Sequence, residues 1–105
     1  MRKRDKKIEN AIRIALTQAC EQLKDNVTGF AWLTHQVDVK HIEKTLKVTF
    51  MFTSLASLNA AKQSLETDAM IRITCDALAQ QHIRLHHAAK QCHFAVDKKA
   101  PEGAF

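Results

Sequence analysis

Glycine and proline are scarce in this chain, and their scarcity constrains both its fold and its chemistry. The two glycines, Gly29 and Gly103, are 74 residues apart, and the single proline is Pro101. Phosphate-binding loops and dinucleotide fingerprints need two or three closely spaced glycines, because only glycine lets the backbone approach a phosphate closely. The sequence therefore excludes these nucleotide-binding motifs and leaves a body in which helices and strands run uninterrupted.

Size and composition predict one small globular domain. The chain has 105 residues, of which 46% are hydrophobic and 26% are charged. We expect a basic N-terminal arm over residues 1–7, a single α+β domain over 8–97 and a flexible tail over 98–105.

The positive charge is concentrated at the N-terminus. The net charge is +5, but the body from Ile8 to Asp97 holds nine basic and nine acidic residues. Lysine and arginine release condensed counterions when they meet a polyanion, so this arm indicates contact with nucleic acid. The alternative is a terminus that only adds solubility. The candidate nucleic-acid contacts are Arg2, Lys3, Arg4, Lys6, Lys7 and Arg13.

Hydrophobic periodicity predicts the elements in the order helix, strand, strand, helix, strand. A helix is expected from Asp5 to about Lys24, strands over 30–39 and 46–52, and a turn at 40–44 between them. Residues 55–81 form either one long kinked helix or two helices meeting near Thr67. In the last element, 83–96, a straight strand would point the apolar residues at its start and those at its end to opposite faces of the sheet. The element therefore needs a bulge or turn near 86–91.

This order predicts an α+β fold with a largely antiparallel sheet of three or four strands and two helices on one face. Two registers compete for the first strand. One points Ala31, Leu33, His35, Val37 and Val39 inward, and the other buries Phe30, Trp32 and Thr34. In the first register the other sheet face is open and carries a patch that could stack bases or form a dimer interface. That candidate interaction face comprises Trp32, Thr34, Lys47, Thr49 and Met51.

Catalytic and metal-binding patterns are weak. The histidines and cysteine of 82–93 match no zinc motif, and we expect no metal site and no cofactor. Cys92 and His93 are adjacent and would point to opposite faces of a strand, so they are poorly placed for proton transfer. We therefore predict no catalytic residues and a protein that is not an enzyme.

Three cysteines without a C-x-x-C pair indicate reduced thiols and a cytoplasmic location. The polar residues of 8–23 are too dense for a signal sequence or a membrane span, so no membrane partner is expected.

Part of the chain resembles a known fold. KDNVTGFAWLTHQVDVKHIEKTLKVTFMF is similar to the first hairpin of the bacterial ribosome-binding factor A group, and IRITCDALAQQHIRL to its second helix and third strand. This resemblance implies a type II KH-like fold over residues 5–96 and an RNA partner. The chain departs from KH domains in lacking G-x-x-G, and it carries Glu66-Thr67-Asp68-Ala69 at the expected kink.

MRKRDKKIENAIR and GFAWLTH also resemble small proteobacterial proteins labelled Fis-family transcriptional regulators. That resemblance implies a bacterial, cytoplasmic protein. Fis-type regulators end in a helix-turn-helix, whereas this chain ends in a strand and tail. We therefore expect a nucleic-acid-binding module, with RNA favoured over DNA. The alternative is an interaction or homodimerisation module that uses the open sheet face.

Overall fold

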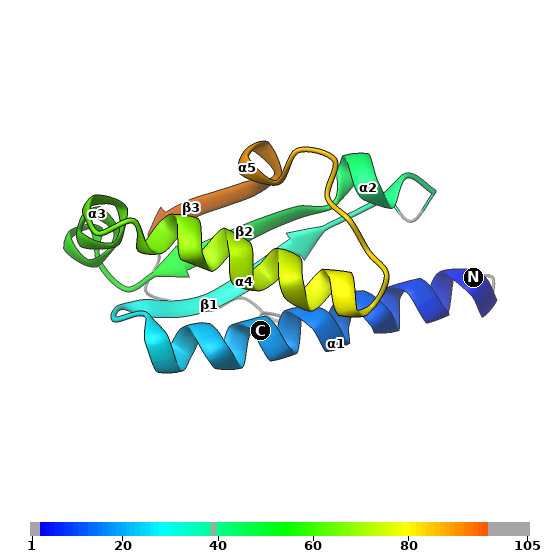
Figure 1. Cartoon of the computed structure of the whole chain (residues 1–105), viewed down its shortest axis with the longest axis horizontal. Helices are drawn as coiled ribbons and strands as arrows, with labels where there is room; N and C mark the ends of the chain where they lie inside the picture. Colours follow the sequence, from blue (N-terminus) through cyan, green and yellow to red (C-terminus); the bar gives the residue numbers. More distant parts are fainter. Residues whose placement is uncertain (1–2, 39, 97–105) are drawn as a thin grey trace.

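The computed structural model describes residues 3–38 and 40–96, with side chains from Lys6 onward. The elements are α1 (Lys3–Asn26), β1 (Phe30–Gln36), α2 (Ile42–Thr45), β2 (Lys47–Phe52), α3 (Leu55–Gln63), α4 (Glu66–Gln80), α5 (Ala88–Gln91) and β3 (Cys92–Val96) (Figure 1). The predicted α+β class is confirmed. Helix α1 begins at Lys3, so most of the predicted arm belongs to this helix, while Arg2 and the predicted tail lie outside the described residues.

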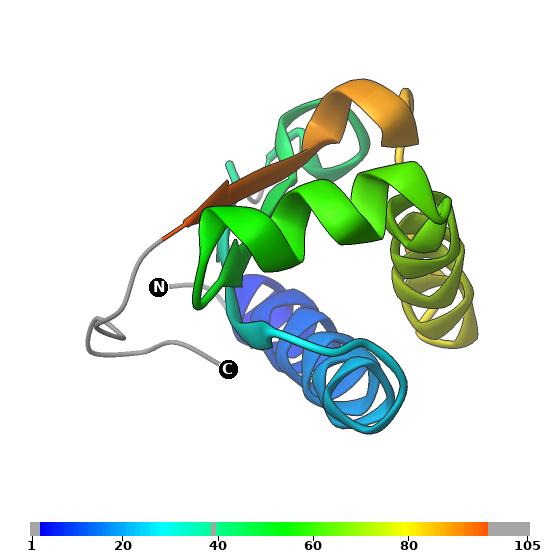
Figure 2. The ribbon, with the colours of Figure 1, turned by 90° about the vertical axis from the view of Figure 1, so that its left-hand side faces the viewer.

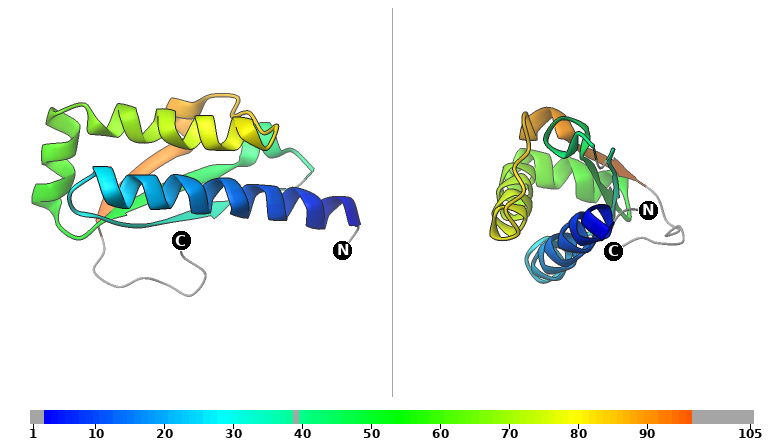
Figure 3. Two further views of the ribbon diagram at one scale, coloured as in Figure 1. Left: turned by 60° about the horizontal axis from the view of Figure 1, so that its bottom comes forward. Right: turned by 90° about the vertical axis from the view of Figure 1, so that its right-hand side faces the viewer.

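The sheet has the order β1-β2-β3, with β2 in the centre. β1 pairs with β2 in antiparallel orientation, as expected, but β2 and β3 are parallel. The parallel pairing arises because α3 and α4 carry the chain from the end of β2 back to its start. α1 and α4 lie side by side on one face of this mixed sheet, and the described residues place no helix on the other face (Figures 2 and 3).

The core lies between this helix pair and β2. Every inward residue of β2 is fully buried, namely Val48, Phe50 and Phe52. Phe50 stacks on Phe94 of β3 with ring centroids 5.1 Å apart, so the central strand joins the parallel pair through its side chains as well. Helix α1 presents a stripe with three- and four-residue spacing, which makes it amphipathic. The fully buried residues of that stripe are Ile12, Ala15, Leu16, Ala19 and Leu23.

A bulge in β1 combines the two registers that compete in the sequence. Phe30 pairs with Phe52, but the pairing shifts between Phe30 and Trp32, so that Trp32 lies opposite Met51. The extra residue, Ala31, changes the parity of the strand. Phe30 and Leu33 therefore both belong to the core cluster, whereas Trp32 points to the face without helices. Neither straight register was right.

The helical region over 55–81 consists of two helices, and they meet earlier than predicted. α3 ends at Gln63 and α4 starts at Glu66, with Leu65 between them in the left-handed region at φ 63°. The predicted position, Thr67, lies in the first turn of α4. Leu65 is 66% exposed, and its side chain disfavours this conformation, so the sequence offers no local signal for the break.

The turn predicted near 86–91 is confirmed by α5, but the start of the last element, 83–85, forms no strand. Before it, α4 ends in a Schellman motif. The N–H of His82 donates to the carbonyl of Ala79 at 2.9 Å, and the N–H of Ile83 donates to that of Leu78 at 2.9 Å. His82 takes the left-handed conformation, with φ 61°, that glycine commonly has at this position. The chain then turns through 83–87 and α5, so that only 92–96 form a strand.

Gly29 marks a close approach between two segments, the turn before β1 and the start of α3. Its φ is +84°, and a Cβ at this position would collide with Cβ and Oγ of Ser57. We predict that Gly29→Ala lowers the free energy of unfolding by about 1–3 kcal/mol, from overpacking and from the positive φ. Urea unfolding measures this change. The neighbouring exposed control Thr28→Ala should stay within about 0.5 kcal/mol, and equal stability of the two variants would contradict the described turn.

A glycine at position 65 should stabilise the protein, whereas loss of the glycine at position 29 should destabilise it. Replacement of a left-handed leucine removes a backbone cost, so we expect Leu65→Gly to raise the free energy of unfolding by about 0.5–1 kcal/mol. Leu55 is the matched control, because it is 63% exposed and begins a helix. Leu55→Gly should destabilise the protein by up to about 1 kcal/mol. Thermal or urea unfolding in which both variants lose stability would show that Leu65 carries no such cost.

Candidate nucleic-acid interface

The N-terminal basic residues extend one end of α1. Lys6 and Lys7 are exposed in its first turns, and Arg13 is exposed two turns later. Lys3 and Arg4 belong to the first turn of the same helix, and Arg2 lies outside the described residues. Because the helix begins at Lys3, its backbone holds Lys6, Lys7 and Arg13 at fixed spacing.

A second basic segment lies at the same end of the molecule. The connection between β1 and β2, residues 37–46, includes α2 and lies beside the start of β2 (Figure 1). Thr45 Oγ1 donates to the carbonyl of His41 at 2.7 Å and accepts the N–H of Asp38 at 2.9 Å, which closes the connection into a compact turn. Lys40 and Lys44 are exposed on it.

A third segment, residues 81–91, is tied to the second. The N–H of His86 donates to the carbonyl of Glu43 at 2.8 Å. The side-chain amide of Gln91 donates to the carbonyls of Glu43 and Leu46 at 2.9 and 2.8 Å. Arg84, exposed in this segment, is thereby held next to α2.

These segments form what we name the basic end, where α1 begins, β1 ends and β2 starts (Figure 3). Its exposed cations are Lys6, Lys7, Arg13, Lys40, Lys44, Lys47, Arg84 and Lys90. Among the side chains that the structure describes, three carboxylates accompany these eight cations, those of Glu9, Asp38 and Glu43. The C-terminal half of α1 together with α3 and α4 has the reverse balance. It carries three cations, Lys24, Lys62 and Arg72, and five carboxylates, Glu21, Asp25, Glu66, Asp68 and Asp76. Six of these eight cations belong to the body of the sequence, from Ile8 to Asp97, and Lys6 and Lys7 precede it. The fold therefore distributes the balanced charges of the body unevenly.

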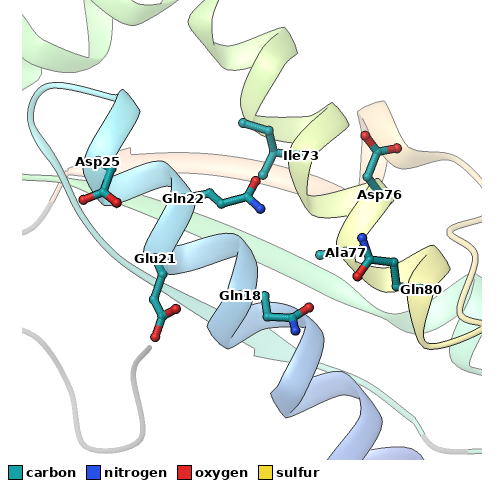
Figure 4. Close-up of a pocket in the computed structure, with 8 residues that line it drawn as sticks. All are labelled: Gln18, Glu21, Gln22, Asp25, Ile73, Asp76, Ala77 and Gln80. Carbon is teal, nitrogen blue, oxygen red and sulfur yellow. The ribbon is translucent and has the colours of Figure 1, made fainter.

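A polar groove between α1 and α4 belongs to the more acidic part. It has a volume of about 530 Å³ and is lined on both helices by carboxylates and amides (Figure 4). Glu21 and Asp25 come from α1, and Asp76 comes from α4, with glutamines between them. No lysine or arginine lines the described groove, so it repels phosphate, and a polyanion would be directed to the other end.

The structure brings the candidate interaction face together on the helix-free side of the sheet. Trp32 pairs with Met51, and Thr34 pairs with Thr49, while Lys47 pairs with Gln36 at the end of the strands. Trp32 is only 6% exposed, however, and its buried indole Nε1 has no hydrogen-bond partner among residues 3–38 and 40–96. In this conformation the ring cannot stack on a base, although the other members of the face are half-buried or exposed.

The cysteines are not activated as nucleophiles. Burial raises the pKa of Cys92 to about 12, and the nearby Cys75 raises it as well. Burial also raises the pKa values of Cys20 and Cys75. A thiolate is the nucleophilic form, so each of these shifts lowers reactivity. Among the described residues, no three His, Cys, Asp or Glu side chains are grouped closely enough to hold a metal ion.

Sequence reasoning missed the second and third segments of the basic end. Lys40, Lys44, Arg84 and Lys90 occur singly among neutral or acidic neighbours, so their charges cancel in a sum over the body. The two connections meet at the start of β2 because β2 and β3 are parallel. A largely antiparallel sheet was predicted, so this meeting could not be foreseen.

Comparison of the chain with known protein families, with curated proteins and with solved structures found no match in any of the three. In the part of the chain that the structure describes, no helix combines the length and apolar character needed to cross a membrane.

His35 gives a pH-dependent prediction. Burial lowers its pKa, and Arg13 lowers it further, with Glu9 opposing. The unfolded chain therefore takes up a proton at higher pH than the folded chain does. Stability that is present above about pH 6.5 is lost as the pH falls through the lower folded-state pKa.

We expect the free energy of unfolding to fall from about pH 7.5 to 5.5 and His35→Gln to make that fall shallower. His93→Gln, an exposed control on the sheet, should follow the wild type. Urea titrations at several pH values measure the slopes. Identical slopes for the wild type and His35→Gln would contradict the prediction.

Proposed function

We propose that this protein is a non-enzymatic nucleic-acid-binding module that contacts phosphate through the basic end. The observation that supports this most is the convergence of α1, α2, 81–87 and α5, each with exposed lysine or arginine. A phosphate polymer presents charges at regular intervals, and several fixed cations on one surface can release several counterions at once. The acidic groove between α1 and α4 would repel such a polymer and would thereby orient the protein relative to it.

RNA is the favoured ligand, and this preference rests on the resemblance to the KH-like ribosome-binding factor A group. The order of the elements and the interruption between α3 and α4 are compatible with that proposed relationship. The corresponding helix junction here carries Leu65 and Glu66 and no basic residue within α4's first turn. The proposal therefore assigns phosphate contact to the opposite end of the molecule, where the cations are.

Homodimerisation through the open sheet face is the alternative. Met51 and Thr49 are only half-buried there, which leaves room for a partner. Trp32 is already buried within one chain, so this residue would add little area to an interface unless it moved. We therefore favour the basic end. Sedimentation at high concentration would detect a dimer directly.

Charge-reducing variants test the function. Fluorescence anisotropy with labelled duplex RNA, single-stranded RNA and duplex DNA should show binding that weakens steeply between about 50 and 200 mM salt. We predict that Lys6→Gln/Lys7→Gln and Lys40→Gln/Lys44→Gln each weaken binding. Each should also reduce the log-log salt slope by roughly 0.7–0.9 for every phosphate that the variant no longer binds.

Lys62→Gln/Arg72→Gln is the matched control, because it removes the same charge from exposed positions on α3 and α4. It should retain nearly the wild-type salt slope. Equally weakened binding in all three variants would mean that net charge alone drives binding. No binding of any of the three nucleic acids at low salt would rule out the proposed function.

A further inference from the structure

Four exposed histidines lie among the cations of the basic end. His41 precedes α2, and His82, His86 and His87 belong to the segment after α4. The two other histidines belong to the sheet. His35 is half-buried near the end of β1, next to Arg13 and Glu9, and His93 is exposed on β3. Imidazole changes its charge between about pH 5 and 8, so the charge of this end is adjustable in the physiological range.

The backbone fixes these histidines in place. His82 is held by the Schellman motif that ends α4, and the N–H of His86 donates to the carbonyl of Glu43. The N–H of His87 donates to the side-chain oxygen of Gln91 at 2.6 Å. The rings of His86 and His87 meet edge to face with centroids 4.5 Å apart. The imidazoles therefore form part of one surface with α2.

The groups around them are predominantly cationic. Arg84 comes from the same segment, Lys44 from α2 and Lys90 from α5, while the end of α4 contributes uncharged Ala79. Glu43 shares a hollow with His82 and Arg84, and Asp38 lies next to His41, whose N–H donates to its carbonyl at 2.9 Å. Protonation of the close pair His86 and His87 adds two like charges to this surface. A bound polyanion would stabilise those charges.

We propose that these four histidines make the basic end a pH-sensitive phosphate-polymer site, which binds more tightly as the pH falls from about 8 to about 6. The inference rests on the proposed function and adds its regulation. Proton uptake and polymer binding each favour the other, because linkage between two binding equilibria is reciprocal. Phosphodiesters keep their charge over this range, so the change in affinity originates in the protein.

The test is anisotropy of the full chain with one labelled duplex RNA at about pH 8 and pH 6, each over a salt series. We expect several-fold tighter binding at the lower pH and a salt slope that steepens by roughly 0.7–0.9 for each histidine that contacts a phosphate. The variant His82→Asn/His86→Gln/His87→Gln should bind as the wild type does at the higher pH and lose most of the gain at the lower one, because only His41 of the four histidines remains. Asparagine is used at 82 because it tolerates the left-handed conformation.

His93→Gln is the control and should keep the full gain, since His93 lies on β3 opposite Thr49 and is not one of the four histidines. The single variants His86→Gln and His87→Gln, each expected to lose part of the gain, serve if the triple variant does not fold. Equal wild-type affinity and salt slope at both pH values would overturn the inference while leaving the proposed function standing. A gain that persists in the histidine variants would also overturn it. Absence of binding at both pH values and low salt would refute both.

Discussion

The central strand β2 is the constraint on which the rest of the structure depends. Its inward residues, Val48, Phe50 and Phe52, are fully buried, and it pairs with β1 on one side and β3 on the other. Because β1 is antiparallel to it, β1 ends where β2 starts. Because β3 is parallel to it, β3 starts there too. Two connections, 37–46 and 81–91, must therefore meet at the start of β2.

This topology explains how a body with equal numbers of basic and acidic residues acquires an uneven distribution of charge in space. Helix α1 ends next to the start of β1, so its own start lies toward the end of β1 (Figure 1). Three segments far apart in the sequence thus gather at one end, and lysines that are isolated in the sequence come to the same end of the molecule. The hydrogen bonds from 81–91 to Glu43 and Leu46 then hold two of these segments together. The proposed function follows from this arrangement more than from the N-terminal run alone.

Much of the fold could be predicted from periodicity, because the core stripe of α1 and the alternation of β2 are strong signals. The register of β1 could not, since Ala31 forms a bulge and parity arguments assume a straight strand. The position of the helix break, at Leu65 instead of near Thr67, and the left-handed conformation of His82 were missed for a related reason. Leucine disfavours the left-handed conformation, and histidine adopts it less readily than glycine does, so local preference gave no clear signal at either residue. The basic end could not be predicted either, because it depends on the parallel pairing of β2 with β3, and only long-range contacts determine that pairing.

The most direct measurement of the central claim is an amide NMR titration of the full chain with a short duplex RNA at low salt. The account predicts chemical-shift changes concentrated at the start of α1, over 40–47 and over 81–91, that disappear as salt is added. It also predicts little change along α3 and the first turns of α4. Changes centred on the helix junction at Leu65 or on the groove lined by Glu21 and Asp76, or no changes at all, would contradict it.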